Sequence, residues 1–134
     1  MAGSNSIALL LDTHALIWWK TNSLSLPESV RRIIADNKNT IVVSAASAWE
    51  IATKVRLGRL PAVSDITRNF AEYLTLSGFE NLPISAEHGI RAGMLPGPQR
   101  DPFDRMLIAQ AQAESLVIVS NEKIFDQYGL RRVW

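Results

Sequence analysis

The chain has 134 residues, of which 47% are hydrophobic and 20% are charged, proportions typical of one globular domain with its own core. A net charge of +1 excludes a protein-wide field that draws the chain onto nucleic acid, so polyanion binding requires a local patch. The absence of cysteine excludes disulfides, thiolate catalysis and zinc–cysteine sites, and two histidines argue against a histidine-rich metal site. Residues 1–6 are mostly polar and carry no export signal, so we expect a flexible tail and a cytoplasmic protein with no membrane anchor.

The first predicted element is a strand at residues 7–11, five apolar residues in a row that stop at Asp12. A run this short and this apolar is typical of a parallel strand buried on both faces. In open α/β folds, ligands gather beyond the carboxyl ends of the strands, which is where Asp12 stands. Asp12 is equally suited to cap a helix that begins at Thr13, and its position alone does not separate the two roles.

Strand and helix patterns alternate along the rest of the chain. The first half predicts a helix at 13–19, a loop at 21–27, a helix at 27–38, a strand at 41–43 and a helix at 45–57. The second half begins with a predicted helix that starts between residues 61 and 64 and ends at 78, followed by an edge strand at 81–84, a helix at 85–95 and a stiff loop at 96–98. It continues with a helix at 103–114, a strand at 116–119, a short helix through 125 and a strand at 130–134. This alternation predicts a single three-layer α/β/α domain with a short parallel sheet flanked by helices.

Four carboxylates occupy comparable places relative to the predicted strands: Asp12, Glu50, Asp104 and Glu122. In a doubly wound sheet these segments can converge at one edge. Carboxylates so placed repel one another, and the arrangement costs stability unless a cation lies among them. Hard oxygen ligands without soft partners indicate Mg²⁺ or Mn²⁺, which typically activate water for attack on a phosphodiester.

Each acid also has a purely structural interpretation. Glu50 has Lys54 four residues later, a spacing that gives an ordinary surface ion pair on a helix. Asp101 and Asp104 both favour a helix amino terminus, and Glu122 can simply open the last short helix. The metal hypothesis therefore depends on all four acids standing at equivalent places, because no single position requires it.

The sequence motifs around these acids are a more specific indication of function than the spacing of the acids. The segments LLDTHALIWW (10–19), VSAASAWEI (43–51), RDPFDRMLIAQA (100–111) and VSNE (119–122), the last followed by Phe125, Tyr128 and Gly129, resemble in order the motifs of PIN-domain proteins of the VapC toxin type. The likeness covers nearly the whole chain at ordinary spacing. It implies a PIN-like fold and a Mg²⁺- or Mn²⁺-dependent endoribonuclease, usually the toxin of a toxin–antitoxin pair and often a homodimer.

Carried over residue by residue, the resemblance makes Asp12, Glu50 and Asp104 metal-binding and catalytic, with Glu122 at the fourth position. Two departures stand out. The fourth position is more often aspartate, so Glu122 adds a methylene and Asn121 is a candidate to share its role. The residue before Arg100 is often histidine in this subgroup but is Gln99 here, a change that weakens substrate positioning without removing an acid.

Further residues are candidates for contact with substrate or phosphate. Arg100 and Arg105 flank the third acid, where a guanidinium can hold a phosphate or neutralise the cluster, and Thr13 and Asn121 adjoin the first and fourth acids. The four tryptophans, Trp18, Trp19, Trp49 and Trp134, are expected to pack in the core or at an interface instead of stacking on RNA bases.

An antitoxin is expected to cover apolar surface on the toxin and to offer a basic side chain to the acids. The segment with Trp18, Trp19, Leu24 and Leu26, together with Leu57 and Leu60, is the apolar surface that the sequence predicts to be exposed. Nothing in the sequence identifies the RNA target, the cleavage site or the antitoxin.

Two other functions share features with this sequence. Aspartyl-phosphate phosphatases also place an aspartate after a buried first strand, but they need a second aspartate two residues later, where this chain has His14. A non-catalytic RNA-binding or regulatory module on the same fold is the main alternative, because a fold does not settle activity. The intact acid set favours the enzyme.

Overall fold

A computed structural model describes residues 6–134, so the predicted tail lies outside the described residues except for Ser6. Its centre is a sheet of five strands, β1 (Ala8–Leu11), β2 (Thr40–Ser44), β3 (Glu80–Leu82), β4 (Val117–Val119) and β5 (Arg132–Val133). The strands lie in the order β3-β2-β1-β4-β5, and every neighbouring pair is parallel. The predicted parallel sheet and its edge strand are thus confirmed, with β1 in the middle.

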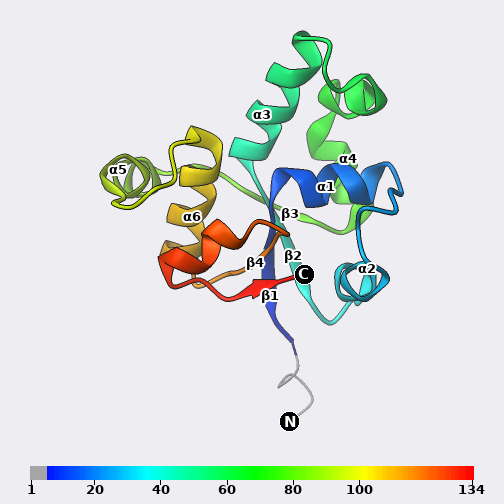
Figure 1. The fold of residues 1–134 in the computed structure, drawn as a ribbon. Helices are drawn as coiled ribbons and strands as arrows, with labels where there is room; N and C mark the ends of the chain where they lie inside the picture. The colour runs from blue at the N-terminus through cyan, green and yellow to red at the C-terminus, as the bar shows by residue number, and fades with distance from the viewer. Residues whose placement is uncertain (1–5) are drawn as a thin grey trace.

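Alternation along β1 divides the core into two layers. Leu9 and Leu11 pack in a cluster with buried residues of the helices α1 (Thr13–Lys20), α2 (Glu28–Ala35) and α4 (Phe70–Ser77). Leu10 packs on the opposite face in a second cluster, dominated by α6 (Pro102–Glu114). Successive side chains of a strand point to opposite faces, so a strand buried on both sides must be apolar at every position. Figure 1 shows α1, α2 and α4 on one side of the sheet and α5 (Ala86–Met94) and α6 on the other.

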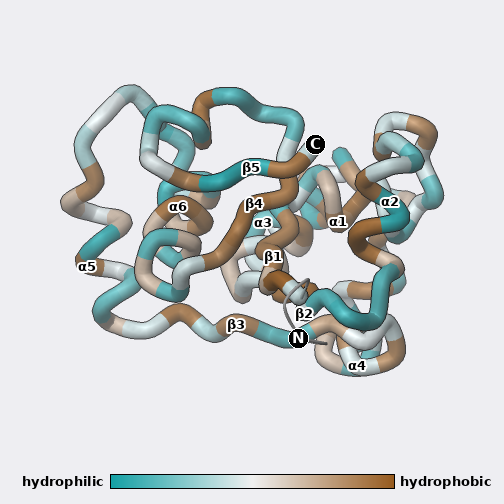
Figure 2. Tube along the Cα trace, turned by 90° about the horizontal axis from the view of Figure 1, so that it is seen from below, coloured by the Kyte–Doolittle hydropathy of each residue, from teal (hydrophilic) through white to brown (hydrophobic). Residues whose placement is uncertain are grey.

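The helix α3 (Ala45–Arg56) extends beyond the sheet from the end of β2. It begins at Ser44, whose hydroxyl accepts a hydrogen bond from the backbone N–H of Ala46 at 2.9 Å. Ser44 is therefore the N-cap of α3. The coloured trace shows the hydrophobic residues of β1 and β4 at the middle of the domain, with hydrophilic loops around them (Figure 2).

The predicted helix ending at residue 78 is wrong in one respect, because two elements replace it. A 3₁₀ helix, η2 (Pro61–Thr67), is followed by α4, which Asn69 starts anew by accepting the N–H of Glu72. An asparagine side chain at an N-cap competes with continuation of the preceding helix. Two smaller differences are that α2 ends at Ala35 instead of near residue 38, and that the edge strand ends at Leu82.

Three of the four tryptophans pack as predicted. Trp18, Trp19 and Trp134 are partly buried against the α1-side core. Trp49 is 60% exposed and makes an edge-to-face contact with Phe103, with 4.7 Å between ring centroids. None of the helices within residues 6–134 combines the length and apolar character that crossing a membrane requires.

Candidate functional site

Asp12 stands at the carboxyl end of the central strand. Its backbone N–H continues the ladder by donating to the carbonyl of Val119 at 3.0 Å, and its side chain is 2% exposed. The Oδ1 atom accepts the N–H of Ala15 at 2.7 Å, so Asp12 is also the N-cap of α1. The capping interpretation is therefore confirmed, and it places a buried carboxylate at the carboxyl edge of the sheet.

Glu50 reaches the same end of the molecule from the middle of α3. It is 5% exposed, and its Oε2 atom lies 2.6 Å from Nζ of Lys54. The predicted ion pair exists, but it joins a buried carboxylate to a partly buried lysine instead of lying on the surface. The other oxygen, Oε1, is buried and has no hydrogen-bond partner among the described residues.

Asp104 lies in the first turn of α6, whose N-cap is Asp101. The Oδ1 atom of Asp101 accepts the N–H of Asp104 at 3.0 Å, which confirms the predicted cap and leaves the Asp104 carboxylate itself directed elsewhere. The amide Nε2 of Gln99 stands 3.5 Å from Oδ2 of Asp104, and its Oε1 accepts the N–H of Asp101 at 3.0 Å. Gln99 thus contacts both ends of this turn while being 8% exposed.

Glu122 follows β4 after Ser120 and Asn121. Its backbone N–H donates to the hydroxyl of the buried Ser120 at 3.0 Å. Its side chain makes no capping bond to the 3₁₀ helix η3 (Lys123–Tyr128), and its Oε1 lies 3.8 Å from Nδ1 of His14. The side chain is thus turned toward the residues after Asp12 instead of toward the helix that it precedes.

The electrostatics show that the four acids are neighbours. Burial, followed by the charges of Glu122, Asp101, Glu50 and Asp12 in decreasing order, raises the pKa of Asp104 to about 8. Burial also raises the pKa of Asp12 to about 6, although the Ser120 hydroxyl and the Ala15 N–H oppose it. Like charges that cannot be solvated separately disfavour ionisation, which is the physical mark of a shared acidic site.

The acids are close enough to influence one another, but their oxygens are not drawn together. Across residues 6–134, no three aspartate, glutamate or histidine side chains are gathered in a way that would hold a metal ion as they stand. Glu50 remains tied to Lys54, and Asp12 to its cap. A shared ligand therefore requires side-chain rotation within the site.

The structure gives the other candidate residues different situations. Arg100 and Asn121 are exposed. Thr13 is buried, and its hydroxyl is bonded to that of Ser47 at 3.0 Å, so it joins α1 to α3 instead of facing solvent. Arg105 donates hydrogen bonds to the backbone carbonyls of Ala92, Leu95 and Gln99 at 2.6–3.1 Å. A guanidinium committed to these carbonyls holds a loop, which corrects the expectation that Arg105 contacts phosphate.

The loop at 96–99 is the part of the site that sequence reasoning missed. Gly97 has φ +95°, and a Cβ there would lie 2.7 Å from the hydroxyl oxygen of Tyr128. The same hydroxyl accepts the N–H of Gln99 at 2.9 Å. Glycine lets the loop approach Tyr128 closely enough to fix Gln99, and Gln99 then contacts Asp104. Two features of the sequence pointed to this loop: the helix-breaking residues Pro96, Gly97 and Pro98, and Gln99 as a difference from the VapC-type motif.

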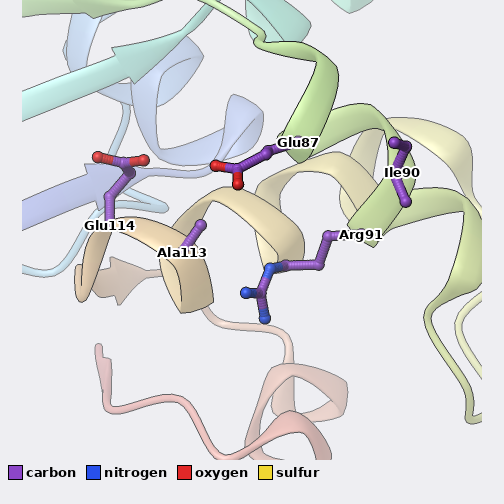
Figure 3. A pocket seen from close by; sticks show the side chains of 5 residues that line it. All are labelled: Glu87, Ile90, Arg91, Ala113 and Glu114. Atoms are coloured by element: carbon purple, nitrogen blue, oxygen red, sulfur yellow. The ribbon is translucent and has the colours of Figure 1, made fainter.

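The hollows in the surface do not all belong to the acidic site. A hollow of about 430 Å³ between α5 and α6 is lined by Glu87, Ile90, Arg91, Ala113 and Glu114 (Figure 3). Its carboxylate Glu114 is already paired with Nε2 of His88 at 3.0 Å. None of the four candidate acids lines this hollow.

Comparison with known proteins adds to this geometry. A family model described as a PIN domain matches residues 9–130, which contain all four acids. The chain belongs to the PIN domain family. Ribonuclease VapC16 of Mycobacterium tuberculosis (strain ATCC 25618 / H37Rv) is 40% identical to this PIN domain over 58 residues, a match that spans 43% of this chain and 40% of that protein.

Solved structures share the fold of this PIN domain over nearly its whole length. VapBC2 from Rickettsia felis bound to a promoter DNA fragment matches with a TM-score of 0.67 and 19% identity, covering 95% of this chain and 98% of that one. DNA-bound VapBC from Salmonella typhimurium gives 0.65 and 22%, covering 95% and 97%. FitAcB from Neisseria gonorrhoeae gives 0.59 and 18%, covering 94% and 96%. At these identities the likeness establishes the fold and nothing further.

The crowded acids of this PIN domain make its metal-free stability depend on pH. In the folded chain Asp104 keeps its proton up to about pH 8, whereas its ordinary pKa is 3.8. Between these values the folded state binds more protons than the unfolded state, so the free energy of unfolding should fall as pH rises and level off above about 8.

Urea unfolding in EDTA at a series of pH values measures this slope, and Asp104→Asn should flatten it. Asp126→Asn is the control, because Arg132 lowers the pKa of Asp126 and moves its effect to more acidic pH. An unchanged slope in Asp104→Asn would contradict the shared acidic site.

Proposed function

We propose that this chain is a Mg²⁺- or Mn²⁺-dependent endoribonuclease that hydrolyses RNA phosphodiester bonds as the toxin of a toxin–antitoxin pair. The observation that carries the proposal is the raised pKa of Asp104, caused by burial and by the charges of Glu122, Asp101, Glu50 and Asp12. Such crowding is costly for a protein that binds no cation. The motif likeness and the relative named ribonuclease VapC16 support RNA as the substrate class.

The residues present suit a hard divalent cation. All donors are carboxylate oxygens, and one of them, Oε1 of Glu50, is buried without a partner among the described residues. Asp12, Glu50, Asp104 and Glu122 would hold the ion, with Asn121 able to contribute beside Glu122. Such an ion, when bound, lowers the pKa of water and stabilises negative charge that develops on the phosphate.

The surrounding residues orient these acids and exclude water from them. The cap to Ala15 fixes Asp12, and the contact with Gln99 limits the movement of Asp104. Burial of Asp12 and Glu50 keeps bulk water from the inner side of the site, which strengthens every charge interaction there. Arg100 and Asn121, both exposed beside the acids, are the residues we assign to contact with the RNA backbone.

Cleavage should require both the metal and Asp104. Asp104→Asn should lower the rate of cleavage of a labelled single-stranded RNA by more than the roughly 10–100-fold typical of losing a residue that only supports a metal ligand. Excess EDTA should abolish cleavage, and added Mn²⁺ or Mg²⁺ should restore it. Asp36→Asn, an exposed position after α2, is the control and should cleave like the parent. Parent protein that cuts equally well in EDTA would refute metal dependence, and parent protein that binds RNA without cutting would favour the non-catalytic module.

The antitoxin surface requires a correction to the sequence expectation. Leu26 is buried, and Trp18, Trp19 and Leu60 are partly buried in the core, whereas Leu24 is fully exposed and Leu57 is 50% exposed. On the same side, a hollow of about 400 Å³ between α1, η2 and α4 is lined by Lys20, Asp65, Ile66, Asn69, Glu72, Tyr73 and Leu76. We assign the antitoxin to this surface, with a basic side chain reaching the acids, in the cytoplasm.

Growth measurements separate toxicity from antitoxin binding. Strong expression of the chain alone should arrest bacterial growth, and co-expression of its cognate antitoxin should restore it. Leu76→Asp, which places a charge on an 80% exposed apolar position of α4, should remain toxic but escape this rescue. Ile90→Asp on α5, 68% exposed and on the opposite side of the sheet, should still be rescued. Unimpaired growth with the parent chain would contradict the toxin function, and equal rescue of both variants would exclude this surface.

A second copy of the chain is assigned to a different apolar hollow. This hollow of about 230 Å³ is lined by Ala46, Trp49, Ile84, Ala92, Gly93, Pro102, Arg105 and Met106. An exposed tryptophan beside an apolar depression is typical of a protein interface. Light scattering should give the mass of a dimer for the parent and for Ile90→Asp, and a monomer for Ile84→Asp. A monomeric parent would exclude the homodimer.

A further inference from the structure

We propose that Lys54 is a positioning residue of the candidate metal site, which holds Glu50 by one carboxylate oxygen so that the other is presented to the cation. The inference rests on the proposed function of the same site. It concerns which atom of Glu50 binds the metal and what keeps that atom in place.

The ion pair differs from an ordinary contact on a helix surface. Lys54 and Glu50 are one turn apart on α3, and Nζ lies 2.6 Å from Oε2. The side chain of Glu50 is only 7% exposed and that of Lys54 is 29% exposed. An exposed pair at this spacing contributes a few tenths of a kcal/mol, about 0.3–0.5, whereas a buried carboxylate needs its partner because an unpaired buried charge is strongly destabilising.

The two oxygens of Glu50 are in unequal situations. Oε2 is occupied by Lys54, while Oε1 is the one buried side-chain nitrogen or oxygen in residues 6–134 without a hydrogen-bond partner. Buried polar atoms are nearly always paired, so an orphan at this place requires an explanation. The charge of Glu50 acts on Asp104, which places this carboxylate next to the other acids. A cation shared with Asp104 would satisfy Oε1 without disturbing Oε2.

Lys54 has two alternative roles: a competitor, which occupies the carboxylate of Glu50 in place of the metal, or a bystander, which takes no part in metal binding. A competitor occupies the oxygen that the metal needs and must leave before binding, but Oε1 is already unoccupied. A bystander adds only stability to α3. The positioning role predicts the opposite change in metal affinity from the other two roles. Loss of a nearby positive charge by itself strengthens cation binding, whereas loss of a residue that orients a ligand weakens it.

Calorimetric titration of the purified chain with Mn²⁺ tests the role directly and does not depend on catalysis. Lys54→Met, which keeps the side-chain length and removes the charge, should weaken Mn²⁺ binding by about 10–100-fold at a temperature where circular dichroism shows the variant folded. Lys54→Arg should recover most of the affinity. Arg56→Gln, which removes an exposed positive charge from the last turn of the same helix, should bind Mn²⁺ at least as tightly as the parent. If Lys54→Met does not fold, Lys54→Gln carries the same expectation.

The outcomes separate this inference from the proposed function. A parent chain that binds no Mn²⁺ overturns the metal site and the role of Lys54 together. A parent chain that binds Mn²⁺ while Lys54→Met binds equally or more tightly overturns only the role of Lys54. A melting temperature lowered in EDTA without any change in Mn²⁺ affinity likewise assigns Lys54 to stability alone.

Discussion

Negative charge held close together away from water is the constraint on which the site depends. The parallel sheet brings Asp12 to its carboxyl edge, and α3 and α6 bring Glu50 and Asp104 to the same end. Burial limits the screening of these charges by water, so Asp104 and Asp12 are less easily ionised than carboxylates in water. This arrangement lowers the stability of the domain. Such a cost is common at functional sites, where local structure is less favourable than the rest of the fold.

Structural and proposed functional roles coincide at these acids. Asp12 caps α1 and still ends the central strand as a buried carboxylate, and Glu50 forms its helix ion pair while one oxygen stays unpaired. A carboxylate has two oxygens, so one can serve the fold while the other stays available to a ligand. An observed cap or ion pair is therefore no evidence against a metal-binding role.

The loop before α6 shows how distant contacts prepare a site. Tyr128 packs against Gly97 and accepts the N–H of Gln99, and Arg105 donates to carbonyls from α5 and from this loop. Together they hold the turn in which Asp104 lies. Gln99 contacts Asp104 through its side-chain amide. Gln99 therefore orients Asp104, and because Gln99 itself is buried, its effect on the site is indirect.

Local patterns in the sequence determined much of this protein. The apolar run ending at Asp12 predicted a doubly buried central strand, and the alternation of short strands with helices predicted the three-layer fold. The caps Asp12 and Asp101 could be predicted because a cap depends on bonds to residues only a few positions away. Breaks in helix continuity were less readable, since Asn69 restarts a helix inside a pattern that allowed a single one.

Tertiary structure alone decided how the side chains around the acids are used. Arg105 looked like a phosphate ligand beside Asp104, but carbonyls 6 to 13 residues away take its donors. Thr13 was a candidate for substrate contact, but it is buried and its hydroxyl is hydrogen-bonded to Ser47, 34 positions along the chain. The spacing of Glu50 and Lys54 predicted their contact as a surface ion pair, but the carboxylate of this pair is buried. Spacing along a helix or strand determines which neighbours can meet, whereas burial and the partners of long side chains depend on elements that only the folded chain brings together.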